Sequence, residues 1–151
     1  MKKTILTIFT VFLFVFTSCK VEPQPINYGH DNCYNCDMTV VSKTHAAQFV
    51  TQKGKQYMFD AAECMVWKIN KDNVEDDLAF ILVTDYTNPG ELVDAKTATF
   101  LISENIQSPM GANLTAFKLK EKAVATQKEH GGKLFTWVEL KNKLGKSMRK
   151  H

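Results

Sequence analysis

Residues 46–59, AAQFVTQKGKQYMF, begin the segment that determines the fold. Two runs rich in apolar, aromatic and β-branched residues, 46–51 and 56–59, flank the turn QKGK at 52–55. Short runs of this composition around a glycine-containing turn are typical of a β-hairpin. The sequence therefore predicts two antiparallel strands joined by a tight turn.

The residues after the hairpin predict a helix and then a third strand. Asp60 directly precedes the apolar helical pattern AAECMVWKIN at 61–70. Glu63 lies three residues after Asp60, and this spacing is close to that of a capping box. We therefore expect a helix from residue 61 to about residue 70, with Asp60 as its N-cap. The apolar run LAFILVT at 78–84 predicts a buried strand. The predicted order is strand, strand, helix, strand.

The second half of the chain shows the same outline. A sharp turn, SPMG at 108–111, separates two predicted strands, and His130-Gly131-Gly132 ends a predicted helix. The predicted elements of this half are strands at 98–102, 114–117 and 133–135 and helices at 120–129 and 137–144. We therefore predict an α+β fold in which two small ββαβ units, about 32–86 and 91–145, form one compact domain at 32–145.

The N-terminus has the pattern of a bacterial lipoprotein leader. Lys2 and Lys3 precede an apolar run at 5–16 that is too short to span a bilayer as a helix. The run ends in Thr17-Ser18-Cys19, which resembles a lipobox and implies cleavage after residue 18 and acylation of Cys19. Several acyl chains give a stable membrane anchor. An ordinary secreted protein with a chance Cys19 is the alternative.

Proline, glycine and the scarcity of large apolar residues predict that residues 20–31, KVEPQPINYGHD, are a tether that follows the lipid anchor. The anchor and tether together comprise residues 19–31, and residues 146–151 are a basic tail. Removal of the predicted signal peptide, residues 1–18, lowers the formal net charge from +3 to +1, because this leader holds two lysines and no acid. A chain with so little basic excess is not expected to bind nucleic acid.

Three cysteines remain beyond Cys19, and the predicted compartment lies outside the cytoplasm, where disulfides persist. An odd number of thiols there needs an explanation. Cys33-Tyr34-Asn35-Cys36-Asp37-Met38 combines thiolates with a thioether, and these soft donors select Cu(I) over hard cations. Residues 39–41 predict a strand, so we expect an extended segment in which Cys36 and Met38 point to the same side.

Further candidate metal ligands lie outside this motif. Met110 sits between Pro109 and Gly111 in a turn, where a methionine is not expected as core filler. If the two halves pack as a repeat, the loops that carry Met38 and Met110 face one another. The complete set of candidates is Cys33, Cys36, Met38, Met110, Cys64, His130 and His45. Three of these candidates have an alternative role. Cys64 can be a small buried hydrophobic residue, His45 a surface residue, and His130 a cation at a helix C-terminus.

Other chemistries remain open for the CxxC pair. One alternative is a Cys33–Cys36 disulfide, and a second is a thiol–disulfide oxidoreductase that uses these two residues. A third is a zinc-stabilised adaptor, in which Cys33, Cys36, Cys64 and one histidine bind the ion. A c-type haem site would need His after the second cysteine, and residue 37 is Asp. The sequence contains no GxSxG, no HExxH and no phosphate-binding loop. We therefore expect a binding protein and not an enzyme.

The ordered set of short motifs resembles a known family. The set consists of the lipobox, Cys33-x-x-Cys36-x-Met38, HAAQ at 45–48, Phe59-Asp60, Cys64-Met65-x-Trp67, SPMG at 108–111, Ala116-Phe117 and His130-Gly131-Gly132. In this order and spacing it resembles the NosL family of copper-binding lipoproteins over nearly the whole mature chain. One departure is Asp37, where the family usually has glycine.

The resemblance implies a function and a setting. It implies a Cu(I) chaperone that helps to metallate nitrous-oxide reductase, with the apo-reductase and a membrane transporter complex as partners. It also implies a pair of ββαβ units resembling part of the organomercurial lyase fold. The expected location is a bacterial membrane, with the lipid-anchored protein facing the periplasm or the cell exterior.

Overall fold

The computed structural model describes residues 20–148. The predicted signal peptide, Cys19 and residues 149–151 of the basic tail lie outside the described residues. The first half contains β1 (Ala47–Thr51), β2 (Gln56–Phe59), α1 (Ala62–Asp72), the 3-10 turn η1 (Glu75–Asp77), β3 (Leu78–Thr84) and β4 (Leu92–Asp94). The second half contains β5 (Thr99–Ile102), β6 (Leu114–Phe117), α2 (Lys120–His130), β7 (Lys133–Phe135) and α3 (Trp137–Met148).

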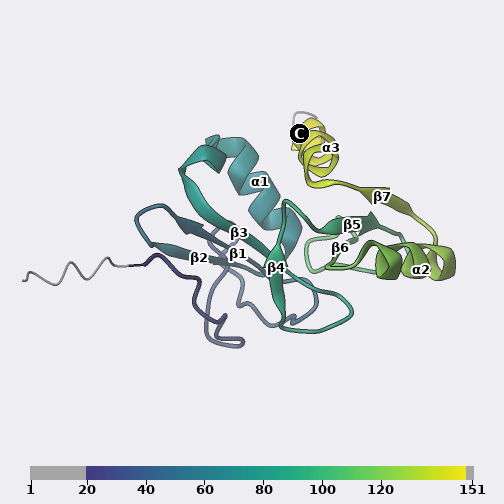
Figure 1. Ribbon diagram of the computed structural model, residues 1–151, viewed down its shortest axis with the longest axis horizontal. Helices are drawn as coiled ribbons and strands as arrows, with labels where there is room; N and C mark the ends of the chain where they lie inside the picture. The colour runs from purple at the N-terminus through teal and green to yellow at the C-terminus, as the bar shows by residue number, and fades with distance from the viewer. Residues whose placement is uncertain (1–19, 149–151) are drawn as a thin grey trace, which may run out of the picture.

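Each half forms its own antiparallel sheet, and the two sheets share one connectivity (Figure 1). The strand order is β2-β1-β3-β4 in the first sheet and β6-β5-β7 in the second. In each half the first strand is central, the second and third strands flank it, and a helix connects these two. This order confirms the predicted α+β fold of two ββαβ units. β4, near the start of the predicted second half, pairs with β3 of the first sheet.

A continuous core joins the two halves. Phe59 and Met65 of the first half belong to the same buried cluster as Phe100, Leu114 and Leu140 of the second half. The helix pair α1 and α3 extends this contact, since the Asn70 amide of α1 donates to the carbonyl oxygen of Lys141 in α3 over 3.0 Å. Trp137 Nε1 of α3 also donates to the carboxylate of Glu75 in η1 over 2.8 Å. Apolar burial of this kind is the main driving force for packing the two units together.

Two local predictions about the first half are wrong. Residues 39–41 do not form a strand; Thr39 makes an isolated bridge to Asn32 and Val41 is exposed. The helix begins at Ala62 with Ala61 in the capping position and no side-chain cap, so Asp60 is not its N-cap. Both Asp60 and Glu63 point into the protein instead of toward the helix end, at 3% and 0% exposure.

The predicted tether is also wrong as a description of residues 21–26. Ile26 is buried against Val40 and Ala46, and the carbonyl oxygens of Glu22 and Gln24 accept hydrogen bonds from side chains of the first sheet. The segment lies across this sheet opposite α1, so the central strand β1 is covered on both faces. Proline-rich composition indicated an extended chain, and the partners that hold it are distant in sequence.

Candidate metal centre

The cysteines of the CxxC motif lie in a tight turn. The Asp37 amide donates to the carbonyl oxygen of Cys33, and the Cys33 amide donates to that of Met38, each over 2.8 Å. Asp37 adopts a left-handed backbone with φ of +63°. The Tyr34 amide donates to the Met58 carbonyl oxygen over 2.9 Å, so the turn is attached to the hairpin. The predicted extended geometry, with Cys36 and Met38 on one side, is therefore wrong.

The third cysteine comes from the first turn of α1. Cys64 is fully buried, and its sulfur joins those of Cys33 and Cys36 and a carboxylate oxygen of Asp60. These four ligand atoms all lie within 4.8 Å of one another. The hairpin positions this site because Asp60 directly follows β2, where the chain turns into α1. All three cysteines are free thiols.

The electrostatics of the site distinguish the three thiols. Interaction with the Cys64 thiol lowers the pKa of Cys33 from 9.0 to about 6, and the same interaction raises the pKa of Cys64. Burial raises the pKa of Cys36 to about 11. Cys33 is therefore the most acidic of the three thiols, and each thiol that binds a metal must first release its proton.

Asp60 completes the donor set and was assigned only a capping role from the sequence. Its Oδ1 lies 3.6 Å from the sulfur of Cys36, which donates to it. Its Oδ2 is buried with no hydrogen-bond partner among the described residues. An orphaned carboxylate oxygen beside three sulfurs is a donor that a bound cation would satisfy. Two acids within the apolar run Phe59–Trp67 were the available sequence signal.

The loop that carries Met110 is fixed by a second missed acid, Glu63. The Glu63 carboxylate accepts a hydrogen bond from the Ser108 hydroxyl, and the amides of Met110 and Ala112 face it. Ser108 Oγ in turn accepts from the Asn113 amide over 2.8 Å. Met110 is partly buried against the core cluster that contains Cys33 and Cys64. The turn at 108–112 is therefore attached to the start of α1, next to Cys64.

The other predicted ligands occupy different surroundings. Met38 is 52% exposed. The Nδ1 atom of His45 lies 3.0 Å from Ser42 Oγ and 2.9 Å from Thr44 Oγ1, and burial lowers the pKa of His45. His130 ends α2, and its carbonyl oxygen accepts from Ser103 and Asn105. Neither histidine belongs to the cysteine–aspartate group, because local hydroxyls hold the first and the second lies on the helix of the other half.

Proteins similar to this chain, which carries a thiol-rich site on a pair of ββαβ units, are copper-binding proteins. Its fold matches the crystal structure of the copper chaperone NosL from Shewanella denitrificans with a TM-score of 0.69 and 20% identity, over 80% of this chain and 96% of the other. The copper-binding lipoprotein NosL of Stutzerimonas stutzeri is 25% identical over 125 residues, which are 78% of this chain and 66% of that protein.

The sequence model of the NosL family matches residues 25–144. The chain therefore belongs to the NosL family. The matched region spans both ββαβ units and includes all three cysteines of the site. Within residues 20–148, no helix has the length and apolar character needed to cross a membrane.

Proposed function

We propose that this protein is a Cu(I) chaperone, anchored by lipid on Cys19 to a bacterial membrane, that supplies copper outside the cytoplasm for nitrous-oxide reductase. The observation that carries the copper proposal is the cluster of three free thiols within 4.8 Å, because sulfur donors favour Cu(I). The named copper-binding and chaperone functions of its relatives support the same assignment. The predicted partners, the apo-reductase and a membrane transporter complex, are part of this proposal.

The site suits transfer better than permanent storage. Cys33 is the most acidic of the three thiols and receives the ion first, while Cys36 lies half-buried at the edge of the site, where a partner's ligand can reach it. Cys64 is inaccessible at the base of the site. Met110 supplies a neutral thioether that adds affinity without adding charge, and Met38 is exposed for contact with an incoming or departing ion.

Competition with a calibrated Cu(I) chelator on the anaerobically purified protein tests the metal and its ligands. Wild type binds one Cu(I) per chain with reduced thiols, and Cys33→Ser or Cys64→Ser lowers the affinity by at least about tenfold. Met110→Leu retains the packing volume but removes the sulfur, so it lowers affinity without changing apo stability. Leu134→Met, in the second-half cluster, is the matched control. Zinc that displaces Cu(I) at equal concentration contradicts the assignment.

The alternatives give different results in the same experiment. Asp60, as a hard fourth donor, favours a zinc-stabilised adaptor. Such an adaptor retains zinc through dialysis and binds copper weakly. A thiol–disulfide oxidoreductase shows a redox-active Cys33–Cys36 pair and no copper. The anchor is tested separately, since Cys19→Ser abolishes lipid labelling and releases the protein from membranes. Continued membrane binding of this variant, with no lipid on wild type, contradicts the anchor.

A further inference from the structure

Three glutamines hold the N-terminal segment on the open face of the first sheet; we call Gln24, Gln48 and Gln56 the glutamine clamp. Gln48 Nε2 donates to the carbonyl oxygen of Gln24 over 2.9 Å, and Gln56 Nε2 donates to that of Glu22 over 3.0 Å. The Gln24 amide donates back to Gln56 Oε1 over 3.3 Å, and Gln48 Nε2 donates to the same oxygen over 2.9 Å.

The strand register makes this arrangement possible. Gln48 of β1 pairs with Met58, and Gln56 of β2 pairs with Val50, so both glutamines project from the same face of the sheet. Gln48 is fully buried, and its Nε2 donates both of its hydrogen bonds within the clamp, to the Gln24 carbonyl oxygen and to Gln56 Oε1. Burying this amide against the backbone of residue 24 gives the segment a defined position.

The clamp begins very close to the predicted lipid. Val21 lies beside Gly54 in the β1–β2 turn, and Glu22 is the first residue held by the clamp. Three residues at about 3.5 Å each allow at most about 10 Å between Cys19 and the clamp. The headgroup layer of one leaflet is about 6 Å thick. The β1–β2 turn is therefore within reach of the membrane surface and cannot move far from it.

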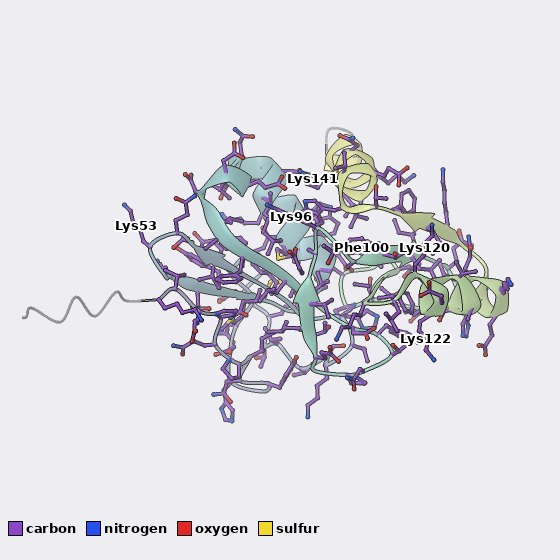
Figure 2. All side chains as sticks on the ribbon, viewed as in Figure 1. Lys53, Lys96, Phe100, Lys120, Lys122 and Lys141 are labelled. Carbon is purple, nitrogen blue, oxygen red and sulfur yellow. The ribbon has the colours of Figure 1, made fainter. Side chains whose placement is uncertain are left out.

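We infer that the glutamine clamp makes the β1–β2 turn a membrane-contacting surface that orients the whole domain on the lipid headgroups. This inference rests on the lipidation of Cys19 in the proposed function. Figure 2 shows Lys53 at the hairpin end of the molecule, next to the start of the described chain, and Lys120 and Lys122 at the opposite end near α2. The clamp thus directs the α2 end of the second half away from the membrane.

The charges at this end favour contact with any phospholipid headgroup and not with anionic lipid alone. Lys20 forms an ion pair with Glu22 over 2.7 Å. Lys53 and Lys55 are exposed on the turn, and Asp76 and Asp77 lie beside it because Gln52 donates to both of their carbonyl oxygens. Cations and carboxylates are therefore balanced. The orientation depends on the short connection and the clamp, so it does not require a negatively charged surface.

The experiment uses the full mature lipidated protein in phosphatidylcholine nanodiscs that contain a headgroup-nitroxide lipid. Amide signals of the β1–β2 turn broaden about fivefold more than those of α2, because paramagnetic broadening falls steeply with distance and the turn is within about 10 Å of the surface. Gln56→Ala removes the centre of the clamp and abolishes this contrast. Gln52→Ala, on the same turn but at a side chain that donates to the Asp76 carbonyl oxygen, retains it.

A second variant and a second readout separate the clamp from folding. A six-residue Gly-Ser insertion before Val21 leaves the clamp intact but lengthens the connection, so it also abolishes the contrast. Trypsin cleavage after Lys20, which releases the domain, is about tenfold faster in Gln56→Ala than in wild type or Gln52→Ala, because cleavage needs local opening. Broadening that is uniform in wild type, or unchanged by Gln56→Ala or by the insertion, overturns the inference. Equal cleavage rates overturn it as well.

Mass spectrometry of the same sample distinguishes the two levels of the proposal. If Cys19 carries no lipid, the anchor in the proposed function is wrong, and the orientation fails with it. If Cys19 is lipidated and the turn shows no selective broadening, only the inference about the clamp is wrong. Adding anionic lipid to the nanodisc leaves the difference in broadening between the β1–β2 turn and α2 unchanged. A difference that appears only with anionic lipid overturns the inference, because charge would then cause the orientation.

Discussion

The buried carboxylate of Glu63 accepts a hydrogen bond from the hydroxyl of Ser108, and this contact joins the helix of the first half to a loop of the second. The two residues are 45 positions apart and are 0% and 8% exposed. The contact places the turn around Met110 beside Cys64. Several consequences of this and related contacts can be measured.

Ser108→Ala removes the donor and leaves Glu63 Oε1 buried without its partner. We expect the free energy of unfolding of the apo protein to fall by about 1–3 kcal/mol, because an unsatisfied buried acceptor retains its desolvation penalty. Urea unfolding measures the change. Thr39→Ala, at an exposed loop hydroxyl with no side-chain hydrogen bond to the described residues, changes stability by less than about 0.5 kcal/mol. Equal effects of the two substitutions contradict a special role for Ser108.

The pH dependence of stability reports the ionisation of Glu63. Burial raises the pKa of Glu63 above its ordinary value of 4.5, so the folded state binds this proton more tightly than the unfolded state. The contribution is fully present below pH 4.5 and is lost as the pH rises through the raised pKa. Glu63→Gln cannot titrate, so its stability relative to wild type increases over that interval. A constant difference from pH 4 to pH 8 contradicts this interpretation.

The Cys64 thiol controls the ionisation of Cys33. Interaction with Cys64 lowers the pKa of Cys33 to about 6, so thiolate absorbance near 240 nm in the metal-free protein titrates with a midpoint about there. Cys64→Ala removes the interaction, and the midpoint moves toward 9.0. Cys33→Ser eliminates the titration and identifies the residue. A midpoint that Cys64→Ala leaves unchanged excludes Cys64 as the cause.

The backbone at Asp37 is strained, and glycine relieves the strain. Its φ of +63° is a conformation that costs L residues about 1–2 kcal/mol and glycine almost nothing. The side chain is exposed, so Asp37→Gly removes no packing. We expect the free energy of unfolding to rise by about 0.5 kcal/mol, reduced by the greater freedom of glycine in the unfolded chain. Asp37→Ala, measured in parallel, lowers it; an increase with alanine contradicts the argument.

Two neighbouring glycines after α2 differ in the space around them. A Cβ at Gly132 would lie 2.3 Å from the carbonyl oxygen of Ile102, whereas at Gly131 it meets nothing within 4 Å. Both have positive φ, so both alanine variants carry backbone strain. We expect Gly131→Ala to cost about 2 kcal/mol, because its φ of 71° and ψ of −166° lie in a region that essentially only glycine adopts. Gly132→Ala forces β5 and β7 apart and costs at least about 3 kcal/mol in urea unfolding. Equal losses contradict the steric account.

Local sequence patterns were sufficient for the order of the elements. The hairpin at 46–59, the helix that follows it and the strand at 78–84 appear as β1, β2, α1 and β3, with small shifts at the ends. The second unit appears with the same connectivity. These elements depend on the spacing of apolar residues and on turn residues, which are properties of short segments. The CxxC motif also marked the site, because thiol spacing is visible in one segment.

Tertiary structure determined which groups the acids at the site contact and where the N-terminal segment lies. Asp60 and Glu63 match a capping box in sequence, but the cysteine turn and the Ser108 loop, both distant along the chain, supply better partners for their carboxylates. The segment at 21–26 has the composition of a free tether, and only the facing glutamines of β1 and β2 give it a position. Sequence by itself determined the elements and the chemistry of the donors. Which polar groups meet depends on contacts across 24 to 45 residues, and no local pattern specifies those contacts.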